Sequence, residues 1–170
     1  MNETFERSDQ PAGPAFEEEG KYLTFRLAEE EYGLGILKVK EIIGRMPVTR
    51  VPEIPQYFMG VINLRGRVIP VMDLRLRLGM SEAVDDERAC IVVVEMEGDS
   101  GRITVGVAVD AVSDVAVIRR EEIEDAPDFG SKVDTRYILG MAKKEEKVKI
   151  LLDIDRVIDG DGKNFMTHAA

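Results

Sequence analysis

One pattern of apolar residues, glycine and aspartate occurs twice in this chain. Residues 58–74 and residues 138–154 carry it without a gap, so that Gly60 corresponds to Gly140, 80 positions later. Repeated segments with one hydrophobic pattern are expected to fold into one supersecondary unit that is built twice. The chain is therefore expected to form two similar lobes, and the cleft between two lobes is a place where partners bind.

A second repeat lies upstream of the first. Residues 32–42 resemble residues 105–115 at an offset of 73, which gives the second copy a longer middle loop. The apolar segments are short, closely spaced and separated by turns that contain glycine and proline, which is typical of small β-barrels. Long segments with a helical period are missing, and this argues against an α/β fold.

Each copy contains a predicted hairpin followed by a short helix. In the first copy the strands are residues 59–64 and 67–72, and Gly66 supplies the positive φ that a tight turn requires. Asp73 and Asp153 occupy equivalent places after the two hairpins. They fit helix N-caps best, and the alternative is a pair of catalytic carboxylates.

The segment before the first hairpin is predicted to be helical. Residues 37–43 would form one or two turns that end at Gly44, with Glu41 on the solvated face. Arg65, at the hairpin tip, is either an ordinary exposed turn residue or an anchor in a protein interface, where arginine is over-represented. An ion pair between Glu41 and Arg65 is conceivable, but the sequence does not establish it.

The charge of the chain restricts its partners. The 170 residues carry a formal net charge of −10, and residues 1–19 hold six acidic side chains against Arg7 alone. We expect this acidic tail to be disordered, and nucleic acid is disfavoured as a partner because its backbone is also negative. No apolar run reaches the roughly 18 residues of a membrane span and no secretory signal is present. These features predict a cytoplasmic protein that does not insert into membranes.

The chain has few residues of the types that commonly carry out catalysis. The one histidine, His168, lies two residues from the end of the sequence, and the one cysteine, Cys90, lies in an apolar run and reads as a buried small hydrophobe. Nucleophilic triads and zinc sites therefore lack their residues. Residues 160–163 match only a fragment of a phosphate-binding loop. We expect no enzymatic activity, no metal and no cofactor.

At the repeated motifs the sequence resembles the CheW family, the coupling proteins of bacterial chemotaxis. The resemblance rests on residues 31–42 and 60–75, with support from 107–115 and 137–140, and it covers roughly residues 20–158. It implies an all-β fold of two five-stranded β-barrels packed side by side with short helices. It also implies an adaptor without catalytic activity.

The resemblance further implies two kinds of partner. Family members link the cytoplasmic tips of transmembrane chemoreceptors to the histidine kinase CheA, whose regulatory domain is homologous to them. The candidates for the receptor groove, carried over by motif, are Ile36, Val39, Glu41, Leu64 and Arg65. The candidates for kinase contacts lie around Gly60 and in residues 112–115, with Val112 and Val115 foremost.

The sequence and the resemblance together predict the organisation of the chain. Residues 1–19 and 159–170 would be flexible tails, and residues 20–158 would form the CheW-like domain, with lobes at about 20–88 and 89–158 that are free to exchange strands. Alone the protein would be a monomer, and with its partners it would join rings or arrays at the inner face of the membrane. An alternative is the same scaffold in another two-component pathway, for surface motility or development.

Overall fold

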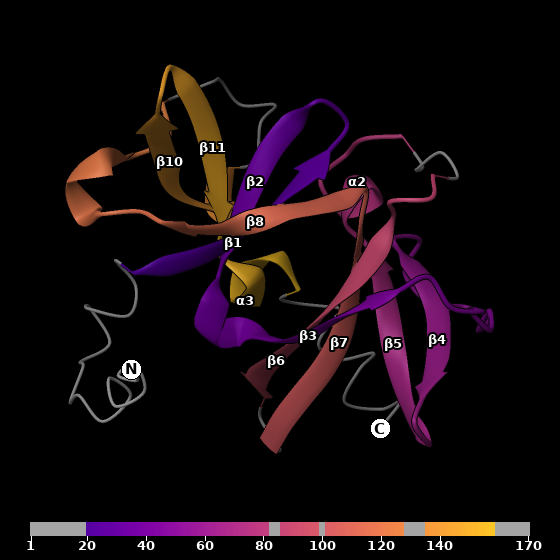
Figure 1. Cartoon of the computed structure of the whole chain (residues 1–170). Coiled ribbons are helices and arrows are strands. Elements are labelled where there is room, and N and C mark those ends of the chain that lie inside the picture. Colours follow the sequence, from indigo (N-terminus) through magenta and orange to yellow (C-terminus); the bar gives the residue numbers. More distant parts are fainter. Residues whose placement is uncertain (1–19, 82–85, 99–100, 128–134, 159–170) are drawn as a thin grey trace, which may run out of the picture.

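The computed structural model of the chain describes residues 20–81, 86–98, 101–127 and 135–158 (Figure 1). The two predicted tails, 1–19 and 159–170, lie outside the described residues. Strands make up most of the described chain, and its helices are short, as the spacing of the apolar segments predicts.

The elements of the first half are β1 (Lys21–Leu27), β2 (Glu30–Gly35), the 3-10 turn η2 (Ile36–Lys38), β3 (Val39–Gly44), β4 (Phe58–Leu64), β5 (Arg67–Asp73) and α2 (Leu74–Arg77). Those of the second half are β6 (Cys90–Gly98), β7 (Gly101–Val109), β8 (Ala111–Val117), η3 (Arg120–Glu122), β9 (Ile123–Glu124), η4 (Thr135–Tyr137), β10 (Ile138–Lys144), β11 (Lys147–Leu152) and α3 (Ile154–Val157).

The strands form two sheets, and each sheet is one lobe of the molecule. The first lobe has the strand order β8-β1-β2-β11-β10-β9, in which β9 is a two-residue addition to five longer strands. The second lobe has the order β3-β6-β7-β5-β4. Figure 1 shows the first lobe around β2, β8 and β11 and the second around β5, β6 and β7.

The two halves of the chain exchange strands between the lobes. In the first lobe β11 runs parallel to β2, and in the second lobe β5 runs parallel to β7. The β4–β5 hairpin ends the first half of the chain and the β10–β11 hairpin ends the second. Each of these two terminal hairpins therefore completes a sheet with a strand of the other half. The lobes therefore do not coincide with residues 20–88 and 89–158; the exchange takes place at the crossovers from β2 to β3 and from β7 to β8.

The hairpin predicted at residues 59–72 is present, with Arg65 and Gly66 at its tip in the left-handed region (φ 51° and 88°). The predicted helix at residues 37–43 is wrong. Only residues 36–38 form a 3-10 turn, and residues 39–44 form strand β3, which pairs antiparallel with β6.

Both aspartates that follow the hairpins are helix caps. The side chain of Asp73 accepts hydrogen bonds from the backbone N–H groups of Arg75 and Leu76, and Asp153 does the same for residues 155 and 156. The two carboxylates are therefore explained by the same structural role in both copies. Nothing in this geometry requires a catalytic pair.

The largest hydrophobic core lies between the lobes rather than inside either one. It takes residues from β1, β2, β6 and β7 together with the ends of both terminal hairpins and α3. Strand β6 contributes to two cores: Val92 and Val94 face the shared core, while Ile91 and Val93 face the smaller core of the second lobe. Because successive side chains point to opposite faces of a strand, one apolar strand can hold both cores together.

Candidate functional site

Glu41 and Arg65 form an ion pair at one end of the second lobe. Glu41 lies on β3 opposite Val93, and the Arg65 guanidinium donates to its carboxylate from the tip of the β4–β5 hairpin. The amide side chain of Asn63 accepts the N–H of Gly66 at 2.8 Å, which fixes this turn. Arg65 is two-thirds exposed, so that most of its guanidinium is available to a partner.

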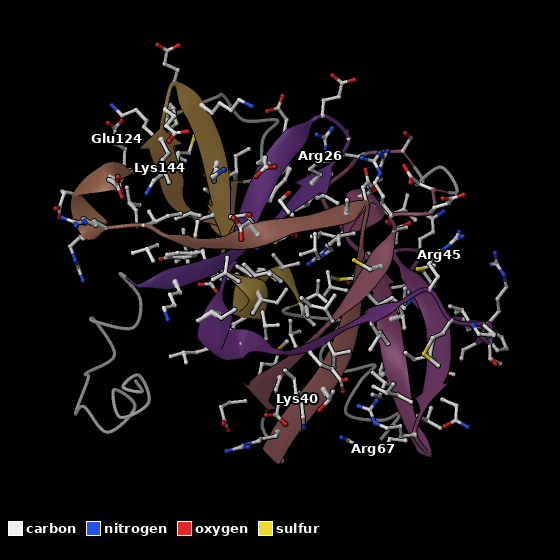
Figure 2. The ribbon with its side chains drawn as sticks, in the orientation of Figure 1. Arg26, Lys40, Arg45, Arg67, Glu124 and Lys144 are labelled. Atoms are coloured by element: carbon white, nitrogen blue, oxygen red, sulfur yellow. The ribbon has the colours of Figure 1, made fainter. Side chains whose placement is uncertain are left out.

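Beneath this pair lies the core of the second lobe. Leu64, the residue before Arg65, is buried there with Ile62 and Ile69, and Ile43 packs against the same cluster. The structure therefore groups three of the five receptor candidates, Glu41, Leu64 and Arg65. In Figure 2, Lys40 of β3 and Arg67 of β5 also lie toward the lower edge of the second lobe.

The other two receptor candidates lie at the crossover between the lobes. Ile36, in η2, and Val39, at the start of β3, are half-buried and pack against the shared core. The register shifts between Val39 and Glu41 where β3 pairs with β6. The five candidates therefore form two groups, one at the crossover and one at the hairpin tip, rather than a single cluster.

A hollow of about 830 Å³ lies where the two lobes meet, and Ile36 is part of its wall. The hollow is lined by residues from both lobes, which come from β1, β2, η2, β6, β7, η3, β9, β10, β11, α3 and nearby loops. Leu37 and Leu139 supply exposed apolar surface to it. The lining also carries the ion pair between Lys38 Nζ and Asp155 Oδ2, at 2.9 Å.

Exposed apolar side chains recur at equivalent positions of the two copies. On the two hairpins the equivalent exposed residues are Met59 and Leu139, and Val68 and Val148. On β3 and β8 they are Ile42 and Val115. The hairpin residues among them were not identified from the sequence. The signal that could have found them is an apolar residue at an outward-facing strand position in both copies.

The three kinase candidates have different surroundings. Gly60 is buried, and a Cβ built on it would lie 2.1 Å from the carbonyl oxygen of Thr49. Val112 is half-buried against the shared core, while Val115 on β8 is exposed. Gly60 and the two valines also belong to different lobes. Of the three, only Val115 has an exposed side chain.

A partly buried ion pair connects α2 with the crossover from β7 to β8. Arg75 Nε donates to Asp110 Oδ1 at 2.9 Å, and the backbone N–H of Ala28 donates to Asp110 Oδ2 at 2.7 Å. Burial by itself would raise the pKa of the Asp110 carboxyl. The hydrogen bonds from Arg75 and Ala28 outweigh that effect, so that this pKa lies below its ordinary value.

Metal binding and thiol chemistry are disfavoured among the described residues. Among those residues no three histidine, cysteine or acidic side chains gather in a way that could hold a metal ion. Burial raises the pKa of the Cys90 thiol, which disfavours the reactive thiolate. No described helix has the length and apolar character to cross a membrane.

Comparison with known proteins decides the family. Residues 21–161 match the CheW-like domain. The chain belongs to the CheW-like family. It is 38% identical over 150 residues to the chemotaxis protein CheW of Klebsiella aerogenes, with 88% of each chain covered. It is 36% identical over 140 residues to CheW of Bacillus subtilis, covering 82% of this chain and 86% of that one.

A solved structure of the CheW-like family supports the same assignment. The crystal structure of the scaffolding protein TtCheW from Thermoanaerobacter tengcongensis superposes with a TM-score of 0.73 at 36% identity, covering 84% of this chain and 94% of that one. The all-β fold in two lobes predicted from the sequence is thereby confirmed. So is membership of a family of chemotaxis scaffold proteins.

Proposed function

We propose that this protein is a non-catalytic adaptor that couples transmembrane chemoreceptors to the histidine kinase CheA. The observation that carries the proposal is that a chain of the CheW-like family exposes both an ion pair at a hairpin tip and apolar side chains at equivalent positions of its two halves. The Glu41–Arg65 pair and the adjacent crossover form one surface, and the outward apolar residues of the lobes form the others.

The receptor would bind along the segment from Ile36 to Glu41 and at the hairpin tip. An amphipathic helical hairpin can bury its apolar face against Ile36, Val39 and the hollow beside them. The charges of Glu41 and Arg65 would then set its register by electrostatic complementarity. An interface of modest size, below roughly 800 Å² per partner, gives weak pairwise binding that becomes strong by avidity in an array.

The kinase would bind at the exposed apolar positions of the lobes that lie outside the hollow. Val115 is the one sequence-derived kinase candidate with a side chain exposed for this purpose. Gly60 would act through the backbone conformation of β4, and Val112 through its packing against the core. Equivalent apolar positions on both lobes allow end-to-end contacts with a homologous kinase domain, and so rings at the inner face of the membrane. The protein itself would remain cytoplasmic.

Replacing Arg65 by glutamate tests the receptor surface. The exchange places two carboxylates together where a receptor would meet Arg65, and we expect receptor binding to fall at least roughly tenfold. The free energy of unfolding should change by less than about 1 kcal/mol, because the Arg65 side chain is exposed. Co-sedimentation with receptor-containing membranes and CheA, with kinase activity scored in the pellet, measures the coupling.

Glu145→Arg is the matched control, because position 145 is the equivalent turn position of the β10–β11 hairpin and also has a positive φ. It should leave receptor binding unchanged. Receptor-dependent kinase stimulation that survives Arg65→Glu would contradict the assigned surface. Kinase binding without any receptor coupling would favour the alternative, the same scaffold in a pathway for surface motility or development.

A further inference from the structure

The two terminal hairpins have nearly interchangeable docking sites. Leu151 of β11 pairs with Gly33 of β2, and at the equivalent place Val71 of β5 pairs with Gly106 of β7. A Cβ on Gly33 would meet Leu151 at 2.9 Å, and one on Gly106 would meet Ile91 of β6 at 2.7 Å and Val71 at 3.4 Å. At both sites a branched apolar residue of the hairpin lies opposite a glycine, and packing alone therefore discriminates poorly between the two hairpins.

The crossovers carry charges that do distinguish the hairpins. Arg75 and Asp155 are equivalent residues, each the second of the short helix that follows its hairpin, and their charges are opposite. Their partners are also opposite in charge: Arg75 binds Asp110 between β7 and β8, and Asp155 binds Lys38 between β2 and β3. Each ion pair therefore joins a hairpin to the crossover that leaves its own lobe.

The alternative docking would reverse both contacts. If the β4–β5 hairpin docked on β2 and the β10–β11 hairpin on β7, Arg75 would lie beside Lys38 and Asp155 beside Asp110. Arg75 and Asp110 are only 15% and 19% exposed in their side chains. A like charge placed at this site would be poorly screened by solvent, and the misdocked state would lose both attractive pairs.

We propose that the oppositely charged ion pairs Arg75–Asp110 and Lys38–Asp155 select which terminal hairpin docks on which lobe. The apolar contacts supply the stability of either docking, and the charges supply the difference between the two. This selection is independent of the proposed adaptor function, because it concerns how the duplicated chain reaches its exchanged arrangement.

The decisive variant exchanges the charges of the exposed pair alone. Lys38→Asp combined with Asp155→Lys keeps the net charge and keeps an attractive pair in the native docking. It also makes the alternative docking attractive, because the new carboxylate at position 38 would meet Arg75 and the new amine at position 155 would meet Asp110. A purely stabilising role for the pair predicts no effect, whereas a selecting role predicts a loss of selectivity.

Energy transfer between labels on two turns reports the docking. Lys149 pairs with Glu31 in parallel register, so the β10–β11 turn and the β1–β2 turn lie at one end of the first lobe. Dyes on cysteines introduced by Glu29→Cys and Glu146→Cys, in the full chain with Cys90→Ser, are close only in the native docking. The variants are unfolded in urea, refolded by dilution and followed at the level of single molecules.

We expect one short-distance population for the parent protein. The charge-exchanged variant should show a long-distance population at least roughly tenfold larger than that of the parent, since a like-charge juxtaposition costs more than the free energy of one decade. Lys143→Glu with Glu124→Lys, which reverses an exposed pair away from the crossovers, should behave as the parent does.

A charge-exchanged variant with the same single population and refolding rate as the parent would overturn the proposal. If that variant failed to fold, Lys38→Ala with Asp155→Ala provides a second test. It removes the like-charge contacts of the alternative docking, and it must then also increase the long-distance population. A parental result for the alanine variant would equally overturn the selection.

Discussion

Arg77 is the residue at which the two copies of the repeat meet. Its guanidinium carbon lies 4.4 Å from the ring centroid of Tyr57 and 4.9 Å from that of Tyr137, and these tyrosines are equivalent residues of the two copies. Arg77 Nε also donates to the carbonyl oxygen of Val157 at 2.5 Å. Val157 is the residue of the second copy that is equivalent to Arg77. One side chain, from the first copy only, thus contacts equivalent residues of both copies, and the two copies differ at this position.

Replacing Arg77 by leucine is expected to lower the free energy of unfolding by about 2 kcal/mol, because it removes two cation–π contacts and leaves a buried carbonyl without this donor. Urea unfolding monitored by circular dichroism measures the change. Arg156→Leu is the control: Arg156 is 63% exposed, and its loss should cost less than about 1 kcal/mol. Equal losses in both variants would show that the stacked position of Arg77 contributes nothing special.

Asp110 makes stability depend on acid pH. Its folded-state pKa is depressed, so its contribution is fully present above the unfolded pKa near about 4 and is lost as the pH falls through the folded value. Asp110→Asn should lower stability at pH 7 by about 1–3 kcal/mol and flatten the pH dependence below about pH 4. Thermal unfolding of both proteins from pH 7 to pH 3 tests this. Parallel curves would contradict the ion-pair origin of the depressed pKa.

At the scale of elements, a glycine bulge lets a third segment pack on each terminal hairpin. The register shifts at Gly60 in β4 and at the equivalent Gly140 in β10. Thr49 bridges to Val61 beside the first bulge, and β9 pairs with β10 beside the second. In each case a Cβ on the glycine would collide with the neighbouring segment.

Gly60→Ala should therefore destabilise the protein by about 3 kcal/mol or more, since the added methyl group meets backbone and the φ of 143° is unfavourable for alanine. Gly44→Ala on β3 is the control, because nothing lies within 4 Å of its Cβ position, and it should change stability by less than about 1 kcal/mol. Denaturant unfolding compares them. A stable alanine variant at position 60 that lost kinase binding would instead favour a direct contact there.

The sequence predicts those features whose causes are local. The hairpin tip at Gly66 and the caps at Asp73 and Asp153 depend on neighbouring residues, and they are present as expected. The helix predicted over the residues of β3 is wrong because their apolar spacing fits both a helix and a strand over so few positions. Its strand partner β6 lies about 50 residues away, and no local pattern encodes that pairing.

The candidate site was predictable only in its parts. The motif identified Glu41 and Arg65 individually, but their contact depends on β3 being a strand that passes the hairpin tip. The surroundings of the kinase candidates also depend on how distant strands pair. Gly60 recurs in the repeat because of a bulge, whereas the outward valines became visible only once the faces of the strands were known.

At the scale of the whole molecule, the shared core makes the two lobes one folding unit. Strands β1 to β5 lie in the first half of the chain, yet β2 needs β11 and β5 needs β7 to complete their sheets. We expect one cooperative unfolding transition, because neither lobe keeps its core when the other is lost.

Cutting the chain between residues 88 and 89 tests this expectation. Each fragment alone should lack the β-sheet signal of the intact protein, and mixing the two should restore it, because every partner strand is then present again. Circular dichroism and gel filtration of the separate and mixed fragments provide the measurement. A fragment that folded by itself would show that a lobe can form without the exchanged strands.

The exchange of hairpins has a consequence for symmetry. Two separate half-length chains with this plan would complete each other only as a twofold dimer, and the two ends of such a dimer would be identical. Joining them in one chain allows the two halves, and with them the two ends, to differ in sequence, as the opposite charges of the equivalent residues Arg75 and Asp155 show. Two identical ends associate through the same surface on both partners, whereas two different ends can associate head to tail. Head-to-tail contacts can close into a ring. A duplicated chain thereby gains a direction that its halves could not have.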